Sequence, residues 1–178
     1  MNKLNKKVKN SLNLIWLIVA VMCVLITYYC MKVKATNNYK EILHTATENC
    51  SIEVIRLVVK NMIDIDNIET PDFTILHNAA NVGCLEVIKF LLDEGANIHI
   101  IGRYGGTALH NATYKGHLEI VRFLLEKGAN PNIKDGNGKT PRTVAVLRSR
   151  HNKDKPYNEI ISLLYEAEKQ VQSGVVKP

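Results

Sequence analysis

The chain has 178 residues and a formal net charge of +6, and 46% of its residues are hydrophobic. This length fits one compact domain with an appendage. Residues 1–40 hold seven lysines and no acidic residue, which gives +7, whereas residues 41–178 hold 16 Lys and Arg against 17 Asp and Glu, which gives −1. Because the basicity belongs to one flank, the remainder lacks the signature of a general nucleic-acid-binding domain, and we expect no nucleic-acid partner.

An uncharged run near the N-terminus predicts a membrane segment. Residues 1–10 form a basic tail, and the uncharged residues 11–31 follow it. A helix needs about 20 apolar residues to cross a bilayer, and Trp16 near one end with two tyrosines near the other suits the two lipid–water interfaces. We therefore predict that residues 11–31 are a single-pass transmembrane helix, an uncleaved signal anchor that tethers the protein to a membrane.

The cleavage and the orientation of this segment stay open. Its apolar centre also fits the core of a secretory signal peptide, although the bulky residues 27–30 after that core argue against cleavage. Four lysines precede the run and three more follow it by Lys40. This distribution leans only slightly toward a cytoplasmic N-terminus with the rest of the chain on the far side.

Beyond a short linker at residues 32–38, the sequence repeats itself with a period of 33 residues. The stretch 105–132 falls on 72–99 when it is shifted back by this period, so that His110 lands on His77. A fixed period predicts a repeat architecture, which has to be recognised before any single motif is interpreted. The copies lie at about residues 39–66, 70–99, 103–132 and 136–167.

One copy is expected to be a pair of short helices. Thr107 can cap the first helix through its hydroxyl, and Gly116 can take the left-handed conformation that ends it. The second helix begins at about Leu118 with apolar residues spaced along one stripe, and Gly128 closes it. Such a unit is too thin to cover its own stripe, so it must stack on copies of itself.

Three segments carry a resemblance to a known family. The runs Thr-Ala-Leu-His-Asn-Ala, Gly-His-Leu-Glu-Ile-Val and Leu-Leu-Glu-Lys-Gly-Ala resemble ankyrin repeats, and the resemblance covers about residues 39–170. It implies an all-α solenoid of stacked helix-turn-helix repeats with turn-like fingers and a concave face. Residues 171–178 are expected to be a C-terminal tail. The resemblance also implies that the chain binds other proteins. Such domains are mostly cytoplasmic, which opposes the lysine distribution.

The first and last copies depart from the pattern. In the first, Cys50 replaces the glycine that ends the first helix elsewhere. A non-glycine residue in a left-handed position costs roughly 1 kcal/mol, so we expect this copy to be the loosest. The last copy inserts seven residues between its two helices, and its final helix is polar enough to close the stack.

The sequence predicts no enzyme, cofactor or small-molecule substrate. Gly138-Lys139-Thr140 matches the end of a phosphate-binding loop, but Ile133 stands where that motif needs a glycine. The three histidines of successive copies are expected about 10 Å apart on parallel side chains, whereas zinc needs converging ligands at about 2 Å. We therefore expect no metal site, and we expect these histidines to hydrogen-bond the threonine and finger backbone. They are His44, His77 and His110.

The four cysteines are expected to be free thiols. Cys23 and Cys30 lie in the apolar run, and Cys50 and Cys84 lie at nearly equivalent places in adjacent copies. Adjacent copies are separated by about 10 Å, which exceeds the limit of roughly 7 Å for a disulfide.

Positions that differ between copies are free to specify a partner, whereas positions that hold the fold are alike. Tyrosine and arginine at such positions are residue types that often dominate the energetics of interfaces. The candidate partner-binding residues are Asn78, Asn81, Arg103, Tyr104, Asn111, Tyr114, Lys115, Arg148 and Arg150.

The inserted loop adds a second hypothesis. Residues 41–72 carry seven acidic against two basic residues, and residues 134–155 carry seven basic against two acidic. We therefore expect the loop from Arg148 to Lys155 to bind an acidic surface. The predicted function is a membrane-tethered, non-catalytic protein–protein interaction module; the alternative is a secreted binding protein with a cleaved signal that acts on a host cell.

Overall fold

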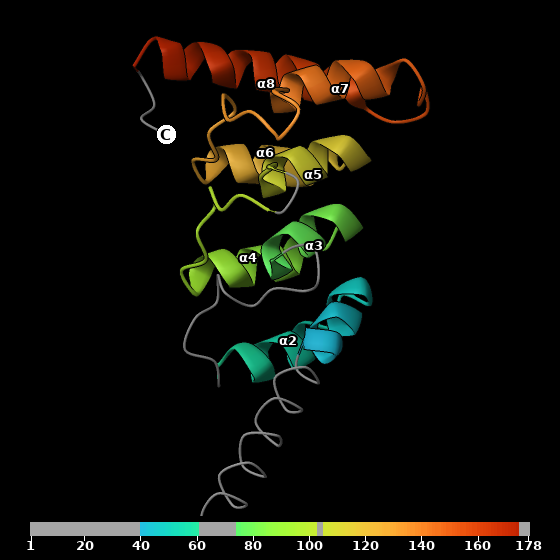
Figure 1. Ribbon diagram of the computed structural model, residues 1–178, viewed down its shortest axis with the longest axis vertical. Coiled ribbons are helices and arrows are strands. Elements are labelled where there is room, and N and C mark those ends of the chain that lie inside the picture. Colours follow the sequence, from blue (N-terminus) through green and yellow to red (C-terminus); the bar gives the residue numbers. More distant parts are fainter. Residues whose placement is uncertain (1–39, 61–73, 103–104, 175–178) are drawn as a thin grey trace, which may run out of the picture. The chain divides into compact units, whose positions relative to one another are not determined.

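The computed structural model describes residues 40–60, 74–102 and 105–174, and within these ranges every regular element is a helix (Figure 1). Residues 40–48 are helical. The helices that follow are α2 (Ile52–Val59), α3 (Ile75–Val82), α4 (Leu85–Asp93), α5 (Ala108–Lys115), α6 (Leu118–Glu126), α7 (Pro141–Ser149) and α8 (Tyr157–Gln172). The predicted membrane segment lies outside the described residues, and none of the helices described is both long and apolar enough to span a bilayer.

The helices form a stack of pairs. Each layer holds two antiparallel helices, and α3, α5 and α7 lie side by side along one edge of the stack (Figure 1). A buried alanine recurs in each first helix, at Ala46, Ala79, Ala112 and Ala145, none of them more than 5% exposed. Small side chains at this position let neighbouring first helices approach closely. The expected all-α solenoid of stacked helix pairs is confirmed.

The second helices supply the larger core residues. Leu91 on α4, Leu124 on α6 and Leu164 on α8 occupy equivalent positions, and each is at most 1% exposed. Burying one leucine side chain contributes about 1.5–3 kcal/mol. A single layer could not bury these residues alone, so the stack is stabilised by contacts between neighbouring layers.

The turn between the two helices of each repeat contacts the next repeat. Gly83 and Gly116 end α3 and α5 with φ of 104° and 75°. A Cβ atom on Gly83 would lie 2.9 Å from the His117 ring, and one on Gly116 would lie 2.9 Å from the Lys155 side chain. These turns therefore need glycine for two reasons, the left-handed backbone and the close approach of the following repeat.

The residue that opens the second helix reaches back to the preceding turn. We call this the opening position; it holds Cys84, His117 and Tyr157, which are equivalent once the seven-residue insertion is allowed for. His117 donates from Nε2 to the carbonyl of Asn81 at 3.2 Å, and the Tyr157 hydroxyl donates to the carbonyl of Tyr114 at 2.8 Å. The two bonds are the same connection made by different side chains.

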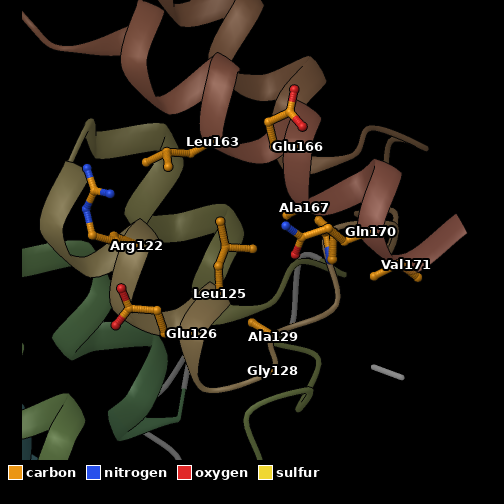
Figure 2. Close-up of a pocket in the computed structure, with 11 residues that line it drawn as sticks. Arg122, Leu125, Glu126, Gly128, Ala129, Leu163, Glu166, Ala167, Gln170 and Val171 are labelled. Atoms are coloured by element: carbon orange, nitrogen blue, oxygen red, sulfur yellow. The ribbon is translucent and has the colours of Figure 1, made fainter. Parts of the chain in front are cut away.

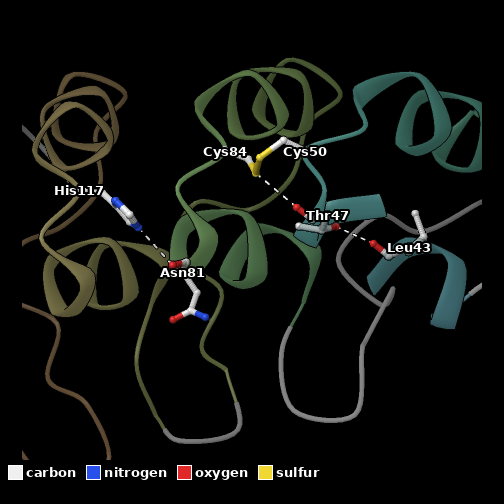
Figure 3. The surroundings of a disulfide bond; sticks show 6 residues. All are labelled: Leu43, Thr47, Cys50, Asn81, Cys84 and His117. Atoms are coloured by element: carbon white, nitrogen blue, oxygen red, sulfur yellow. Dashed lines mark hydrogen bonds between the residues drawn. A yellow bond between two sulfur atoms is a disulfide. The ribbon is translucent and has the colours of Figure 1, made fainter. Parts of the chain in front are cut away.

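At the first interface the opening position forms a disulfide (Figure 3). Cys84 is bonded to Cys50, and their Cα atoms are 5.6 Å apart. The expectation of two free thiols about 10 Å apart is therefore wrong for this pair. The value of about 10 Å is the spacing of packed helix axes, but a turn leans on the opening position of the next repeat, which brings residues 34 apart much closer.

Two histidines connect the first helices to the fingers. The Nε2 of His77 lies 3.0 Å from the carbonyl of Gly106, and that of His110 lies 3.1 Å from the carbonyl of Lys139. Because a carbonyl only accepts, Nε2 carries the proton and Nδ1 accepts. Nδ1 of His77 lies 2.8 Å from the Thr74 hydroxyl, and Nδ1 of His110 accepts the backbone N–H of Thr107 at 3.1 Å. The expected hydrogen-bonding role is confirmed for both.

His44 differs from these two histidines. It is half-buried, its Nδ1 accepts from the Asn78 amide at 3.0 Å, and its Nε2 lies 3.5 Å from the carboxylate of Glu48. Its bonds therefore tie the first helix of the first repeat to that of the second and to the last turn of its own helix.

Burial keeps three histidine rings of the stack neutral. Desolvation by burial lowers the pKa of His77, His110 and His117 below the ordinary value of 6.5, and it outweighs their hydrogen bonds to backbone carbonyls, which act in the opposite direction. The charged form is disfavoured because little water reaches it. At neutral pH the connecting hydrogen bonds are therefore made by neutral imidazoles.

We expect Leu124→Ala to lower the free energy of unfolding by about 2–5 kcal/mol, because it removes a fully buried side chain and leaves a cavity. Lys115→Ala should change it by no more than about 0.5 kcal/mol, because its side chain is only half-buried at the end of α5. Denaturant unfolding of the full-length chain in detergent micelles measures both. Equal losses would mean that the core has been assigned to the wrong face.

We also expect stability to fall on acidification through the histidine range. The folded-state pKa values of His77, His110 and His117 lie below the unfolded value of 6.5, so the unfolded chain binds more protons. The free energy of unfolding should have its full value above about pH 7. It should decrease as the pH falls below 6.5, by at most about 1.4 kcal/mol per pH unit for each histidine.

Unfolding measured between pH 7.5 and pH 5 tests this dependence, because ordinary carboxyl groups titrate near pH 4. A free energy of unfolding that stays constant across this range would contradict the expectation.

Candidate protein-interaction surface

The last turns of the first helices form one row along the edge of the stack. Because neighbouring repeats are offset by 33 residues, these positions come into line, and we call them the variable row. The row consists of Asn81 and Val82 on α3, Tyr114 and Lys115 on α5, and Leu147 and Arg148 on α7. Equivalent positions in it carry amide, aromatic, aliphatic and cationic side chains, so the fold does not dictate their chemistry.

Large apolar side chains are exposed along this row. Val82 is 36% exposed, Tyr114 46% and Leu147 37%. On α5, Tyr114 is the exposed residue, and its seven neighbours are buried or half-buried. A scattered apolar side chain on a surface needs no explanation, but here one stands in the last turn of each of three adjacent first helices.

Tyr114 and Arg148 form a cation–π pair. The guanidinium carbon of Arg148 lies 4.2 Å from the centroid of the Tyr114 ring, and one guanidinium nitrogen lies 3.5 Å from the tyrosine hydroxyl. Each of the two groups restricts the other, so both are held in place before any partner arrives. Preorganised tyrosine and arginine lose less conformational entropy on binding than mobile ones.

The inserted loop is fixed at its ends and exposed between them. Lys155 lies against Gly116 and donates from Nζ to the carbonyl of Lys115, and the Tyr157 hydroxyl bonds to the carbonyl of Tyr114. Arg150 and Lys153 are exposed. Two of the four cations of the predicted binding loop, Arg148 and Lys155, are thus occupied in holding the last repeat to α5, and two project from it.

Two of the candidate residues connect repeats. Asn78 is 7% exposed and its amide donates to His44, while the Asn111 amide donates to the carbonyl of His77 at 3.2 Å. Their side chains lie between neighbouring first helices, away from the variable row. Both positions hold asparagine, and this identity was the signal for a role in the fold. Arg103 and Tyr104 lie outside the described residues.

The finger tips lie at the other end of each repeat. Ile101 in the second finger is 59% exposed. In the third finger, the Asp135 carboxylate accepts the backbone N–H groups of Asn137 at 2.8 Å and Lys139 at 2.9 Å, which fixes a tight turn. This finger therefore presents Lys134 and Asn137, both exposed, on a rigid backbone.

A hollow of about 360 Å³ lies between α6 and α8 (Figure 2). Leu125 and Ala129 line one side, and Leu163 and Ala167 line the other, with charged groups around the rim. No pattern in the sequence predicted this hollow. It exists because α8 has 16 residues and runs past the end of the nine-residue α6. Its lining offers apolar contact, with the guanidinium of Arg122 and the carboxylates of Glu126 and Glu166 as the charged groups.

The described residues offer packing and hydrogen bonding rather than a reactive constellation. Among them, no group of three or more His, Cys, Asp or Glu side chains is placed to hold a metal ion. The buried histidines use both ring nitrogens within the stack. What the surface can do chemically is make apolar, aromatic and cationic contacts with another macromolecule.

Comparison with known protein families gives one match. The profile described as "Ankyrin repeats (3 copies)" matches residues 9–102 and residues 76–173, and its first match begins before the predicted membrane segment. A comparison with curated proteins finds none that matches. The profile covers most of the chain, and the helix pairs follow its period. The protein therefore belongs to the ankyrin repeat family, whose members generally act as protein–protein interaction modules and not as enzymes.

Proposed function

We propose that this chain is a non-catalytic protein–protein interaction module, tethered to a membrane by residues 11–31, that binds a partner protein through the variable row and the finger tips. The observation that carries the proposal is the row of unlike side chains in the last turns of α3, α5 and α7, in which each helix exposes one large apolar residue. A protein that used the stack only as a spacer would have no physical reason to expose Val82, Tyr114 and Leu147 together.

The chemistry of the row supports a protein partner. Tyrosine and arginine are enriched among the residues that dominate binding energy, and Tyr114 and Arg148 lie at the middle and the end of the row. The apolar groups of Val82 and Leu147 flank them, so a partner could bury a continuous apolar strip with cations at one end. The first helices below are locked by buried alanines and hydrogen bonds, which makes the surface rigid.

The tether rests on sequence. Residues 11–31 are uncharged and long enough to cross a bilayer as a helix. The linker of seven residues at 32–38 reaches at most about 25 Å. The partner would therefore be bound close to the membrane surface. Membrane fractionation of the full-length chain, with resistance to alkaline extraction as the criterion, tests the tether by itself.

We expect Tyr114→Ala to weaken partner binding by about 30-fold or more, the loss typical of an interface hot spot. Partners captured on the full-length chain in detergent micelles are titrated against this variant. Tyr165→Ala is a matched control, because Tyr165 is 49% exposed and also lies near cations, but on α8. Equal dissociation constants for the two variants would reject the variable row as the binding surface.

We expect reversal of the two projecting loop cations to slow association. Arg150→Glu with Lys153→Glu should lower the association rate constant at low salt by about three- to tenfold and flatten its salt dependence, because opposed charges steer encounter. Arg122→Glu with Lys127→Glu makes the same change of charge at exposed positions on the α6 side and should have a smaller effect. An unchanged rate in the loop variant would leave the loop as a spacer.

A further inference from the structure

The first repeat closes its turn with a residue that the backbone disfavours. Cys50 has φ of 51°, and it is the one non-glycine residue with positive φ among the residues described. The equivalent turns use Gly83 and Gly116, which adopt this conformation without strain. A cysteine in this place holds an unfavourable backbone conformation, and the bond to Cys84 is the interaction that it makes possible.

The bond joins the two repeats at the point where they already touch. Every turn in the stack lies against the opening position of the next repeat, and a side chain at that position reaches back to it. At the first interface this pair of positions holds Cys50 and Cys84, with Cα atoms 5.6 Å apart, inside the range that a disulfide needs. The bond therefore requires no rearrangement of either helix pair.

The first repeat leaves more large apolar side chains exposed than the repeats that follow, although the guanidinium of Arg56 on α2 packs over the Phe90 ring of α4 at 4.5 Å. Its helices leave Ile42 37%, Val54 38% and Leu57 68% exposed. The Asn78 amide that reaches it bonds to the half-buried side chain of His44, whereas the equivalent Asn111 amide bonds to a backbone carbonyl. Terminal repeats of a solenoid have a neighbour on one side only, and this one relies on a covalent link.

We propose that the Cys50–Cys84 disulfide is a redox staple, a bond that fixes the first repeat to the second and that reduction breaks. It forms because the stack faces an oxidising compartment. Disulfides persist in secreted, periplasmic and lumenal environments and are rare where thiols are kept reduced. On the proposed membrane tether, this places the repeats on the non-cytoplasmic side. The lysines, four before residues 11–31 and three after, lean the same way.

The reduced state also has a place in the structure. Sγ of Cys84 lies 3.3 Å from the carbonyl oxygen of Thr47, a contact that becomes a hydrogen bond only when the sulfur carries a proton (Figure 3). Cys84 is 4% exposed, whereas Cys50 is exposed. A thiolate from solvent can therefore attack Sγ of Cys50, break the S–S bond and expel Cys84 as a thiolate. The Cys84 thiolate then takes up a proton, and the resulting thiol donates a hydrogen bond to the carbonyl oxygen of Thr47.

Thiol–disulfide exchange balances this step. The attacking small thiol becomes mixed-disulfide-bonded to Cys50, and a second small thiol then releases Cys50 as a thiol and leaves as part of a small-molecule disulfide. Two small thiols are oxidised for each staple reduced. The reverse exchange, with a small disulfide as the oxidant, forms the staple.

The first test traps the thiols in cells. Full-length protein with Cys23→Ala and Cys30→Ala, so that only the stapled pair can react, is expressed in a bacterial host, quenched in acid and alkylated with a maleimide polymer. We expect no adduct before reduction and two adducts after it. Adducts on freshly quenched protein would overturn the proposal. Membrane fractionation of the same samples separates the two ideas: soluble, oxidised protein rejects the tether alone, and membrane-bound, reduced protein rejects the staple alone.

The second test measures what the staple holds. Hydrogen exchange of the full-length chain in detergent micelles is compared with and without reductant. A disulfide typically raises local stability enough to slow exchange roughly 30- to 1,000-fold, so we expect reduction to accelerate exchange by that factor in α2 and by less than about threefold in α6. Equal acceleration in both helices, or none in α2, would overturn the staple.

A double variant separates the bond from the strained turn. Cys50→Gly with Cys84→Ser removes the bond and gives the turn the residue that its backbone favours. We expect fast exchange in α2 regardless of reductant. Slow exchange in α2 of this variant would mean that the strained turn, and not the absent bond, loosens the first repeat, and this would also overturn the proposal.

Discussion

The contact between a turn and the opening position of the next repeat is the constraint on which the stack depends. Each turn closes one helix pair and supports the next pair, and a Cβ atom on Gly83 or Gly116 would lie 2.9 Å from a side chain of the following repeat. The opening position then makes the connection with whatever chemistry it carries. A thiol forms a disulfide, an imidazole bonds to the carbonyl of Asn81, and a phenol bonds to the carbonyl of Tyr114. The geometry is conserved along the stack while the interaction changes.

The variable row lies directly before these turns, and only its backbone carbonyls accept the connecting hydrogen bonds, so most of its side chains are left free. Alignment of neighbouring repeats is set by the turns, by the buried alanines and by the histidines that bond to the fingers. Most side chains of the variable row contribute little to that alignment, so they can be chosen for a partner. Arg148 is an exception, because it both belongs to the row and stacks on Tyr114. In the last repeat, therefore, the binding surface and the attachment of the inserted loop share a residue.

The sequence predicted the features that depend on local backbone chemistry. The 33-residue period, the helix ends at Gly116 and Gly128, and the bonds of His77 and His110 all follow from residue types at fixed offsets. The sequence-based predictions were wrong where a distance depends on how closely a turn approaches the next repeat. Helix-axis spacing placed Cys50 and Cys84 too far apart, because it ignored the approach of residues 34 apart. The role of Asn78 was also missed, although its repetition as Asn111 indicated that both hold the fold.

The first and last repeats of the described stack are stabilised by different interactions. A terminal layer has no neighbour to cover its outer face. At the C-terminal end, α8 is 16 residues long and polar outside, and the nearly buried carboxylate of Glu168 accepts from Arg142 at 2.6 Å, which joins α8 to α7. Its own length and an ion pair close this end. The first repeat has an eight-residue α2 and a strained turn instead. This helix is about as long as α4 and α6 inside the stack, and a covalent bond placed at the turn adds stability without enlarging it.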